Sequence, residues 1–150
     1  MKVTKFNEKQ NDLPIIVLVS HGLFAEVLLN TARLIAGENI SNMIALCLEE
    51  GDNPTDFCQK LNSILKEEEE SKFVMVDLYG GTPCNSAVLA IGEVNQNFEI
   101  VSGLNLPMLL EVLSMRDTSN ISELVSIAEA AGKEGICNAK ERFLQTAKGG

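Results

Sequence analysis

Four short apolar runs, separated by helical patterns, constrain this fold more than any other feature of the sequence. They are Ile15–Ser20, Met43–Leu48, Phe73–Leu78 and Phe98–Val101. Each run is rich in aliphatic or β-branched residues, which is typical of strands that are covered on both faces. Alternating strands and helices build right-handed strand–helix–strand units. We therefore expect an α/β fold of three layers, a sandwich with a central, mainly parallel sheet of four strands.

The stretches between and after these runs predict five helices. Asn53, Thr82 and Asn105 each precede one of them and are residue types that serve as N-caps. The expected helices are Leu23–Ile35, Pro54–Glu69, Pro83–Ile91, Leu106–Met115 and Ile121–Ala131. The pattern over Glu134–Phe143 is ambiguous, because Gly135-Ile-Cys137 suits either a short strand or a helix.

The length of 150 residues suits a single domain. We expect this domain over residues 14–146, with a flexible polar leader over residues 1–13 and a frayed end over residues 147–150. No apolar run reaches the roughly 18 residues that a membrane helix needs, and the polar start has no apolar signal core. These features favour a cytoplasmic protein.

The net charge of −9 argues against two classes of partner. Such an acidic surface repels nucleic acid and anionic lipid, so neither is expected as a partner. The four cysteines lack close metal-type spacing, and a single histidine cannot complete a usual zinc set. We therefore expect reduced thiols, no metal site and no cofactor.

Small and polar residues follow each expected strand, where open parallel sheets bind their ligands. Ser20 and His21, the single histidine of the chain, follow the first strand, and Asp77 lies near the end of the third. A carboxylate on one ring nitrogen fixes the tautomer and leaves the lone pair of the other nitrogen available. Asp77 is thus the leading candidate to orient His21, and the alternative is an aspartate that caps a nearby loop.

The segment Gly80-Gly-Thr-Pro-Cys-Asn85 is the more specific motif. Two glycines let the backbone approach a ligand closely, and the first amides of a helix attract anions. Gly80, Gly81 and Thr82 are therefore predicted to hold phosphoryl oxygens, with Ser20 as a further candidate. The alternative is a capped turn without a ligand. Nucleotide binding is not indicated, because the lysine of a Walker loop is missing.

Together these residues predict phosphoryl transfer through a nucleophilic imidazole. Such transfer mainly needs positioning and charge stabilisation. No arginine, lysine or carboxylate cluster for Mg²⁺ accompanies His21 in the motifs, so a metal-free carrier fits better than a kinase. A hydrolase that uses Cys84 with His21 and Asp77 is a different class, but nothing in the sequence singles out an oxyanion site for that thiol.

Three segments, residues 16–22, 76–85 and 102–111, resemble the enzyme IIA domain of the mannose-type sugar phosphotransferase system, within a match from about Ile15 to Phe143. The resemblance implies that His21 accepts a phosphoryl group from the histidine-containing phosphocarrier protein. It then passes the group to an enzyme IIB, which serves the membrane sugar permease. It also implies that Asp77 orients His21, that Thr82 lies near the phosphoryl group, and that a homodimer exchanges an antiparallel strand, here Gly135–Ala139.

Two positions depart from the family, since Ser20 replaces a frequent threonine and Tyr79 a common tryptophan. Leu23 and Phe24 either form an apolar collar, which excludes water or docks a partner, or belong to the helix core. Two other functions stay open: the related phosphotransfer subunit of a dihydroxyacetone kinase, and, in a different class, a regulatory module that senses phosphorylation. The transported sugar is not indicated, because its specificity resides in the membrane components.

Overall fold

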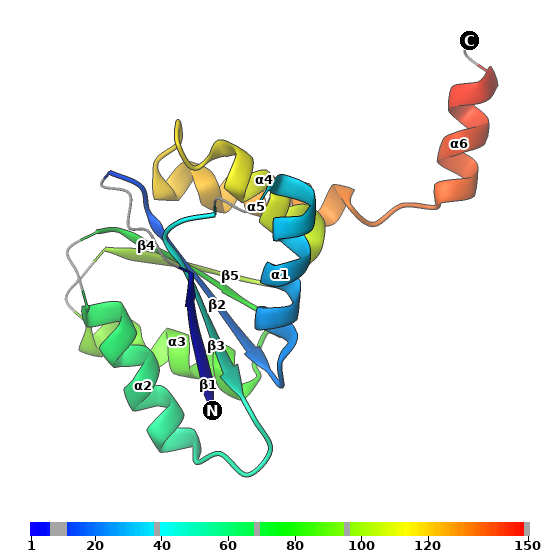
Figure 1. Cartoon of the computed structure of the whole chain (residues 1–150). Helices are drawn as coiled ribbons and strands as arrows, with labels where there is room; N and C mark the ends of the chain where they lie inside the picture. The colour runs from blue at the N-terminus through cyan, green and yellow to red at the C-terminus, as the bar shows by residue number, and fades with distance from the viewer. Residues whose placement is uncertain (7–11, 38–39, 68–69, 95–96, 149–150) are drawn as a thin grey trace.

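A five-stranded sheet forms the centre of the molecule in the computed structural model, which describes all residues except 7–11, 38–39, 68–69, 95–96 and 149–150 (Figure 1). The strands are β1 (Lys2–Phe6), β2 (Ile15–His21), β3 (Met43–Leu48), β4 (Lys72–Val76) and β5 (Phe98–Ser102). They lie in the order β1-β3-β2-β4-β5. Strands β3, β2, β4 and β5 are parallel to one another, which confirms the parallel sheet expected from the four apolar runs.

Helices cover both faces of this sheet, as expected for a three-layer sandwich. They are α1 (Phe24–Ala36), α2 (Pro54–Lys66), α3 (Thr82–Glu93), α4 (Leu106–Met115), α5 (Ile121–Glu134) and α6 (Ala139–Lys148). Figure 1 shows α1, α4 and α5 on one face and α2 and α3 on the other. A separate apolar core lies between each group and the sheet. None of the helices within the described residues is long and apolar enough to cross a membrane.

The central strand β2 is buried on both faces, which explains why apolar and polar residues do not alternate along it. Ile16 and Leu18 enter the core beneath α1, whereas Val17 and Val19 enter the core of α2 and α3, and all four are fully buried. Because side chains alternate along a strand, the next two residues also diverge. Ser20 therefore points toward α1, and His21 points toward the α2 and α3 side.

The helix starts follow the predicted caps in two cases out of three. Asn53 accepts the N–H of Thr55 at 2.8 Å, and Asn105 accepts the N–H of Met108 at 3.0 Å. The expectation for Thr82 is wrong, because Gly81 is the N-cap and Thr82 is already helical. Gly81 takes that position since the chain must pass close to an imidazole there.

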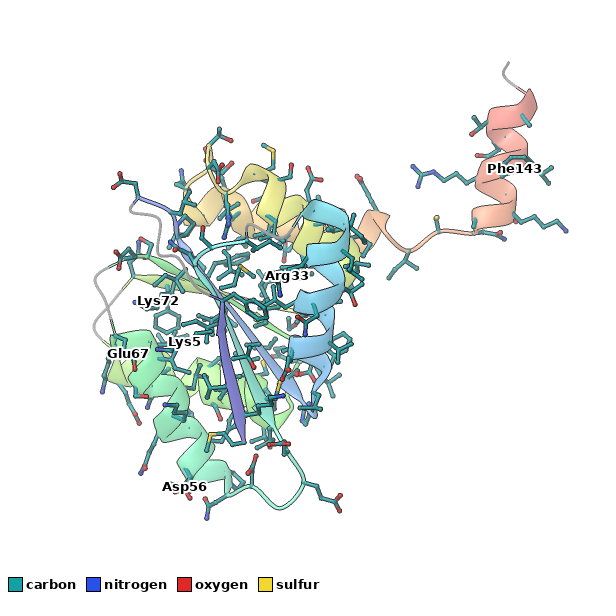
Figure 2. The ribbon with its side chains drawn as sticks, in the orientation of Figure 1. Lys5, Arg33, Asp56, Glu67, Lys72 and Phe143 are labelled. Carbon is teal, nitrogen blue, oxygen red and sulfur yellow. The ribbon has the colours of Figure 1, made fainter. Side chains whose placement is uncertain are left out.

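The expected flexible leader is wrong for Lys2–Phe6, which forms the edge strand β1 and pairs antiparallel with β3. Lys5 forms an ion pair with Glu67 at 2.6 Å, and the guanidinium of Arg33 lies 4.9 Å from the ring centroid of Phe6 (Figure 2). A short strand that carries lysines is typical of a protected sheet edge, which is why its polarity resembled a leader. Residues 7–11 of that expectation lie outside the described residues.

The C-terminal segment also differs from the expectation. Helix α5 continues to Glu134, residues 136–138 have no regular structure, and α6 begins at Ala139. The strand Gly135–Ala139 is therefore not formed within one chain, and residues 147–148 are helical rather than frayed, while residues 149–150 are not described. Figures 1 and 2 show α6, with Phe143, standing away from the body. An exchanged strand would need a second copy, so the exchange stays a prediction.

Candidate functional site

His21 and Asp77 lie together at the carboxyl ends of β2 and β4. The Nδ1 atom of His21 is 2.9 Å from Oδ2 of Asp77, and the same oxygen accepts the backbone N–H of His21 at 2.9 Å. The other oxygen, Oδ1, accepts the N–H of Leu78 at 2.8 Å. These contacts hold the carboxylate, whose side chain is 15% exposed, against an imidazole that is 44% exposed.

This contact determines which ring nitrogen is available for chemistry. An ionised carboxylate only accepts hydrogen bonds, so in the neutral imidazole Nδ1 of His21 carries the proton and Nε2 has the free lone pair. The Cε1–Nε2 edge of the ring lies against Gly81. A Cβ atom added to Gly81 would stand 2.5 Å from Cε1 and 3.1 Å from Nε2, so this close approach requires glycine.

The glycine turn joins the end of β4 to α3 beside the imidazole. Gly80 is the third residue of a four-residue turn and has a φ of +78°. The N–H of Gly81 closes this turn by donating to the carbonyl of Leu78 at 3.4 Å. The half-buried Thr82 then opens α3. Amides in the first turn of a helix have no acceptor within that helix, so the positive end of α3 adjoins the imidazole. The structure thus brings Gly81 against His21, with Gly80 and Thr82 on either side of it in the chain.

Ser20 is the expected site residue that the structure does not bring to Nε2. It is fully buried, and its Oγ accepts the N–H of Ala25 at 2.8 Å and lies 3.3 Å from the carbonyl oxygen of Gly22. Helix α1 has Leu23 at its N-cap, which offers no capping side chain, and the Ser20 hydroxyl serves the first turn instead. The prediction that Ser20 holds a phosphoryl oxygen is therefore wrong, because the pleat of β2 directs it to the opposite face.

The thiol of Cys84 does not belong to the site. Cys84 is buried in the apolar core of α2 and α3, where it packs with Ala87 and Ala90. A nucleophilic thiolate needs a partly exposed, electropositive setting. The hydrolase interpretation is therefore wrong, because the imidazole is exposed at the edge of the sheet whereas the thiol is buried in the apolar core.

Exposed apolar side chains follow both of the strands whose ends carry His21 and Asp77. Leu23 and Phe24 follow it at the start of α1 and are 45% and 43% exposed, whereas Leu78 and Tyr79 follow β4 and are 59% and 83% exposed. The interpretation of Leu23 and Phe24 as helix core is therefore wrong. Leu78 and Tyr79 add to the collar expected from Leu23 and Phe24, and we use the name apolar collar for all four residues from here on.

An acidic loop follows β3 at the same edge of the sheet. This loop consists of residues 49–52. The N–H of Gly22, next to His21, donates to the carbonyl of Leu48, the last residue of β3, at 2.7 Å. Asp52 accepts the ammonium of Met1 at 2.6 Å and the N–H of Glu49 at 2.7 Å, and these two bonds lower the pKa of its carboxyl group. The loop is thus folded back on itself and bonded to the N-terminus.

One residue that the sequence places after the third strand, without a role, shapes the turn. Asn85 donates from Nδ2 to the carbonyl of Gly80 at 3.0 Å. Its place in the Gly-Gly-Thr-Pro-Cys-Asn motif was the available signal, but spacing alone does not indicate which backbone group a side-chain amide will bind.

The fold and the site together define a doubly wound α/β domain with one oriented histidine at the carboxyl edge of its parallel sheet. A family model described as "PTS system fructose IIA component" (EIIA-man) matches residues 15–129. The chain therefore belongs to the mannose-type enzyme IIA family of the sugar phosphotransferase system. The match leaves β1 and α6 outside its bounds.

Individual relatives agree with this assignment. The chain is 34% identical over 135 residues to the mannose-specific EIIAB component of Escherichia coli, covering 88% of this chain and 41% of that protein. It is 32% identical to the fructose-specific EIIA component of Bacillus subtilis, covering 88% and 92%. A solved mannose/sorbose specific IIA subunit from Enterococcus faecalis superposes with a TM-score of 0.74 at 33% identity, covering 84% and 94%. This chain thus spans about two fifths of the E. coli relative.

Proposed function

We propose that this protein carries a phosphoryl group on Nε2 of His21. It takes the group from the histidine-containing phosphocarrier protein and passes it to an enzyme IIB, which supplies the membrane sugar permease. The observation that carries this proposal is the 2.9 Å contact between Nδ1 and Asp77, since it reserves Nε2 as the nucleophile. Membership of the IIA family supports the identity of donor and acceptor.

The transfer is a displacement between two imidazoles. The lone pair of Nε2 forms a bond to phosphorus while the phosphorus–nitrogen bond of the donor breaks, and that electron pair returns to the donor ring. The phosphorylated His21 ring then carries a positive charge with Nδ1 still protonated. The carboxylate of Asp77 stabilises this charge, and it stays in place during the reaction.

The start of α3 supplies the groups that hold the transferred oxygens. Gly81 leaves space against the imidazole, and the N–H groups of the first helical turn present partial positive charge. We assign the hydroxyl of Thr82 as a further donor. Ser20 has no part in this cradle.

The apolar collar supports docking of a carrier protein around His21. Exposed apolar residues that surround a reactive group mark a protein contact, and their burial excludes water from the transfer. Because donor and acceptor both exchange the same phosphoryl group, they use this surface in turn. A cytoplasmic location follows from these two partners.

We also propose a homodimer in which residues 135–139 add a strand to a second copy. Strand β5 lies at the edge of the sheet within the described residues, and a groove of about 420 Å³ runs beside it, lined by Val88, Ile91, Ile100 and Val125 among others. Ile136 is 83% exposed in the single chain. Ile136→Asp is expected to convert a dimer to a monomer in light scattering, and a monomeric native protein would refute the exchange.

The carrier function is tested by labelling with phosphoenolpyruvate, enzyme I and the phosphocarrier protein. We expect one acid-labile phosphoryl group, which alkaline peptide mapping assigns to His21, and no label in His21→Ala. Cys84→Ser is the matched control and should label normally. Uptake by His21→Ala would refute the proposal.

A second experiment measures which protein accepts the phosphoryl group from the labelled chain. Discharge to an enzyme IIB would indicate the sugar system, and discharge to a dihydroxyacetone-binding subunit would indicate the kinase alternative. A phosphoprotein that discharges to neither would indicate a regulatory module.

A further inference from the structure

We propose that Asn85 is a positioning residue for phosphoryl transfer, an inference that rests on the carrier function proposed above. Its side-chain Nδ2 donates to the carbonyl of Gly80 at 3.0 Å, and its backbone N–H donates to the carbonyl of Gly81 at 2.9 Å. One residue in the first turn of α3 thus binds two consecutive carbonyls of the glycine turn. It holds the turn through these two carbonyl groups.

The glycine turn needs such an anchor because its own bonds are weak. Glycine adopts many backbone conformations, and two in sequence lose much entropy when they are ordered. The bond that closes the turn, from the N–H of Gly81 to the carbonyl of Leu78, is long at 3.4 Å. The amide of Asn85 provides the shorter contact and selects one orientation for the peptide group between Gly80 and Gly81.

The orientation of that peptide controls the space beside Nε2. The Cα of Gly81 lies so close to the ring that a Cβ would overlap Cε1 at 2.5 Å. A small shift of Gly81 therefore changes where phosphorus can stand relative to Nε2. Misplacement of reacting groups by about 1 Å can cost on the order of 100-fold in rate. The same shift also moves Thr82 and the first amides of α3.

Two substitutions separate the donor of Asn85 from its shape. Asn85→Asp keeps the size of the side chain but replaces the donor by a carboxylate oxygen, which repels the carbonyl of Gly80. Asn85→Ala removes the anchor without adding charge. Asn120→Ala is the matched control, because Asn120 is an exposed asparagine that accepts the N–H of Glu123 at 3.0 Å and caps α5, away from the imidazole.

The experiment measures single-turnover transfer from the phosphorylated phosphocarrier protein to the full chain over a range of donor concentrations. For both Asn85 variants we expect the maximal rate to fall about tenfold or more, with the half-saturating donor concentration within about twofold of the unsubstituted protein. Asn120→Ala should keep the original maximal rate. Label should still reach His21 in all variants.

The nitrogen-15 signals of the His21 ring give a second measurement. They would not change if Asn85 only stabilised the fold. Nitrogen-15 spectra of the unphosphorylated protein should report the Nδ1–H tautomer, and the Asn85 variants should shift or broaden the Nε2 signal. Unchanged maximal rates and unchanged ring signals would overturn the inference, while normal labelling of His21 would leave the carrier function standing. A rise in half-saturation alone would also overturn it, because it would make Asn85 a docking residue.

Discussion

Asp77 binds His21 twice through one carboxylate oxygen, once at the ring Nδ1 and once at the backbone N–H, each at 2.9 Å. Because one oxygen contacts both the backbone and the ring, this double contact fixes the orientation of the imidazole relative to the end of β2. The ring therefore presents Nε2 to the start of α3 before any partner binds. Such preorganisation lowers the cost of reaching the transfer geometry.

Asp77→Asn should impair transfer while leaving the fold intact. An amide can present N–H rather than oxygen to Nδ1 and so select the wrong tautomer, and it cannot stabilise a positively charged phosphoimidazole. We expect a loss on the order of 10²- to 10⁴-fold in transfer rate, where the upper value is the loss seen when the orienting carboxylate of a catalytic histidine is neutralised. Rapid-quench transfer measures it, and a rate within tenfold of the original would contradict the orienting role.

Gly81→Ala should abolish phosphoryl uptake, because its Cβ would stand 2.5 Å from Cε1 of His21. Gly92→Ala is the control within the same helix, since a Cβ there meets nothing within 4 Å. The control should label normally and gain about 0.5–1 kcal/mol of unfolding free energy. Labelling measured beside urea denaturation distinguishes the two variants, and normal uptake by Gly81→Ala would contradict the close approach.

Ser20→Ala should affect stability rather than chemistry. The substitution leaves the N–H of Ala25 without its 2.8 Å acceptor in a buried position. The free energy of unfolding should fall by about 1–2 kcal/mol, as for the loss of a helix cap. Urea titration checks this change. A large loss of transfer at unchanged stability would return Ser20 to the phosphoryl cradle.

Tyr79→Ser should weaken partner docking without changing the reacting groups. The Tyr79 side chain is 83% exposed and lies next to the turn that contacts His21. We expect the half-saturating concentration of donor to rise about tenfold, as for loss of an aromatic contact worth roughly 1.4 kcal/mol, with the maximal rate unchanged. Phe143→Ser on the distant α6 is the control. Equal effects of both substitutions would argue against the collar as the docking surface.

Arg116 should stabilise the end of the sheet that lies away from the imidazole. It is buried, and its Nη1 donates to the carbonyl of Ser41 at 2.7 Å, while burial lowers the pKa of its guanidinium. Arg116→Ala should lower the free energy of unfolding by about 2–3 kcal/mol, because a charge-assisted bond and its packing are lost together. Denaturation measures the loss, and His21 should still be labelled in the folded variant.

The predictable part of the fold is the part with strong local signals. Strands β2, β3, β4 and β5 are nearly continuous apolar runs, and Asn53 and Asn105 cap the helices that they were predicted to cap. Strand β1 was not predictable, because a polar five-residue segment becomes a strand only when it finds the open edge of β3. The extension of α5 to Glu134 likewise depended on packing against α4.

The sequence was enough to recognise His21, Asp77 and the glycine turn as one site. Parallel strands bring their carboxyl ends to one edge of the sheet, so the residues that follow each apolar run lie close together even when the exact register is unknown. Their separate roles depended on the tertiary structure. The pleat of β2 sends Ser20 and His21 to opposite faces, and only packing places the amide of Asn85 on the Gly80 carbonyl. The sequence by itself therefore determined which groups could react, whereas the three-dimensional structure decided which atom reacts and which neighbour holds it, because contacts shorter than 3.5 Å depend on side-chain direction rather than on spacing along the chain.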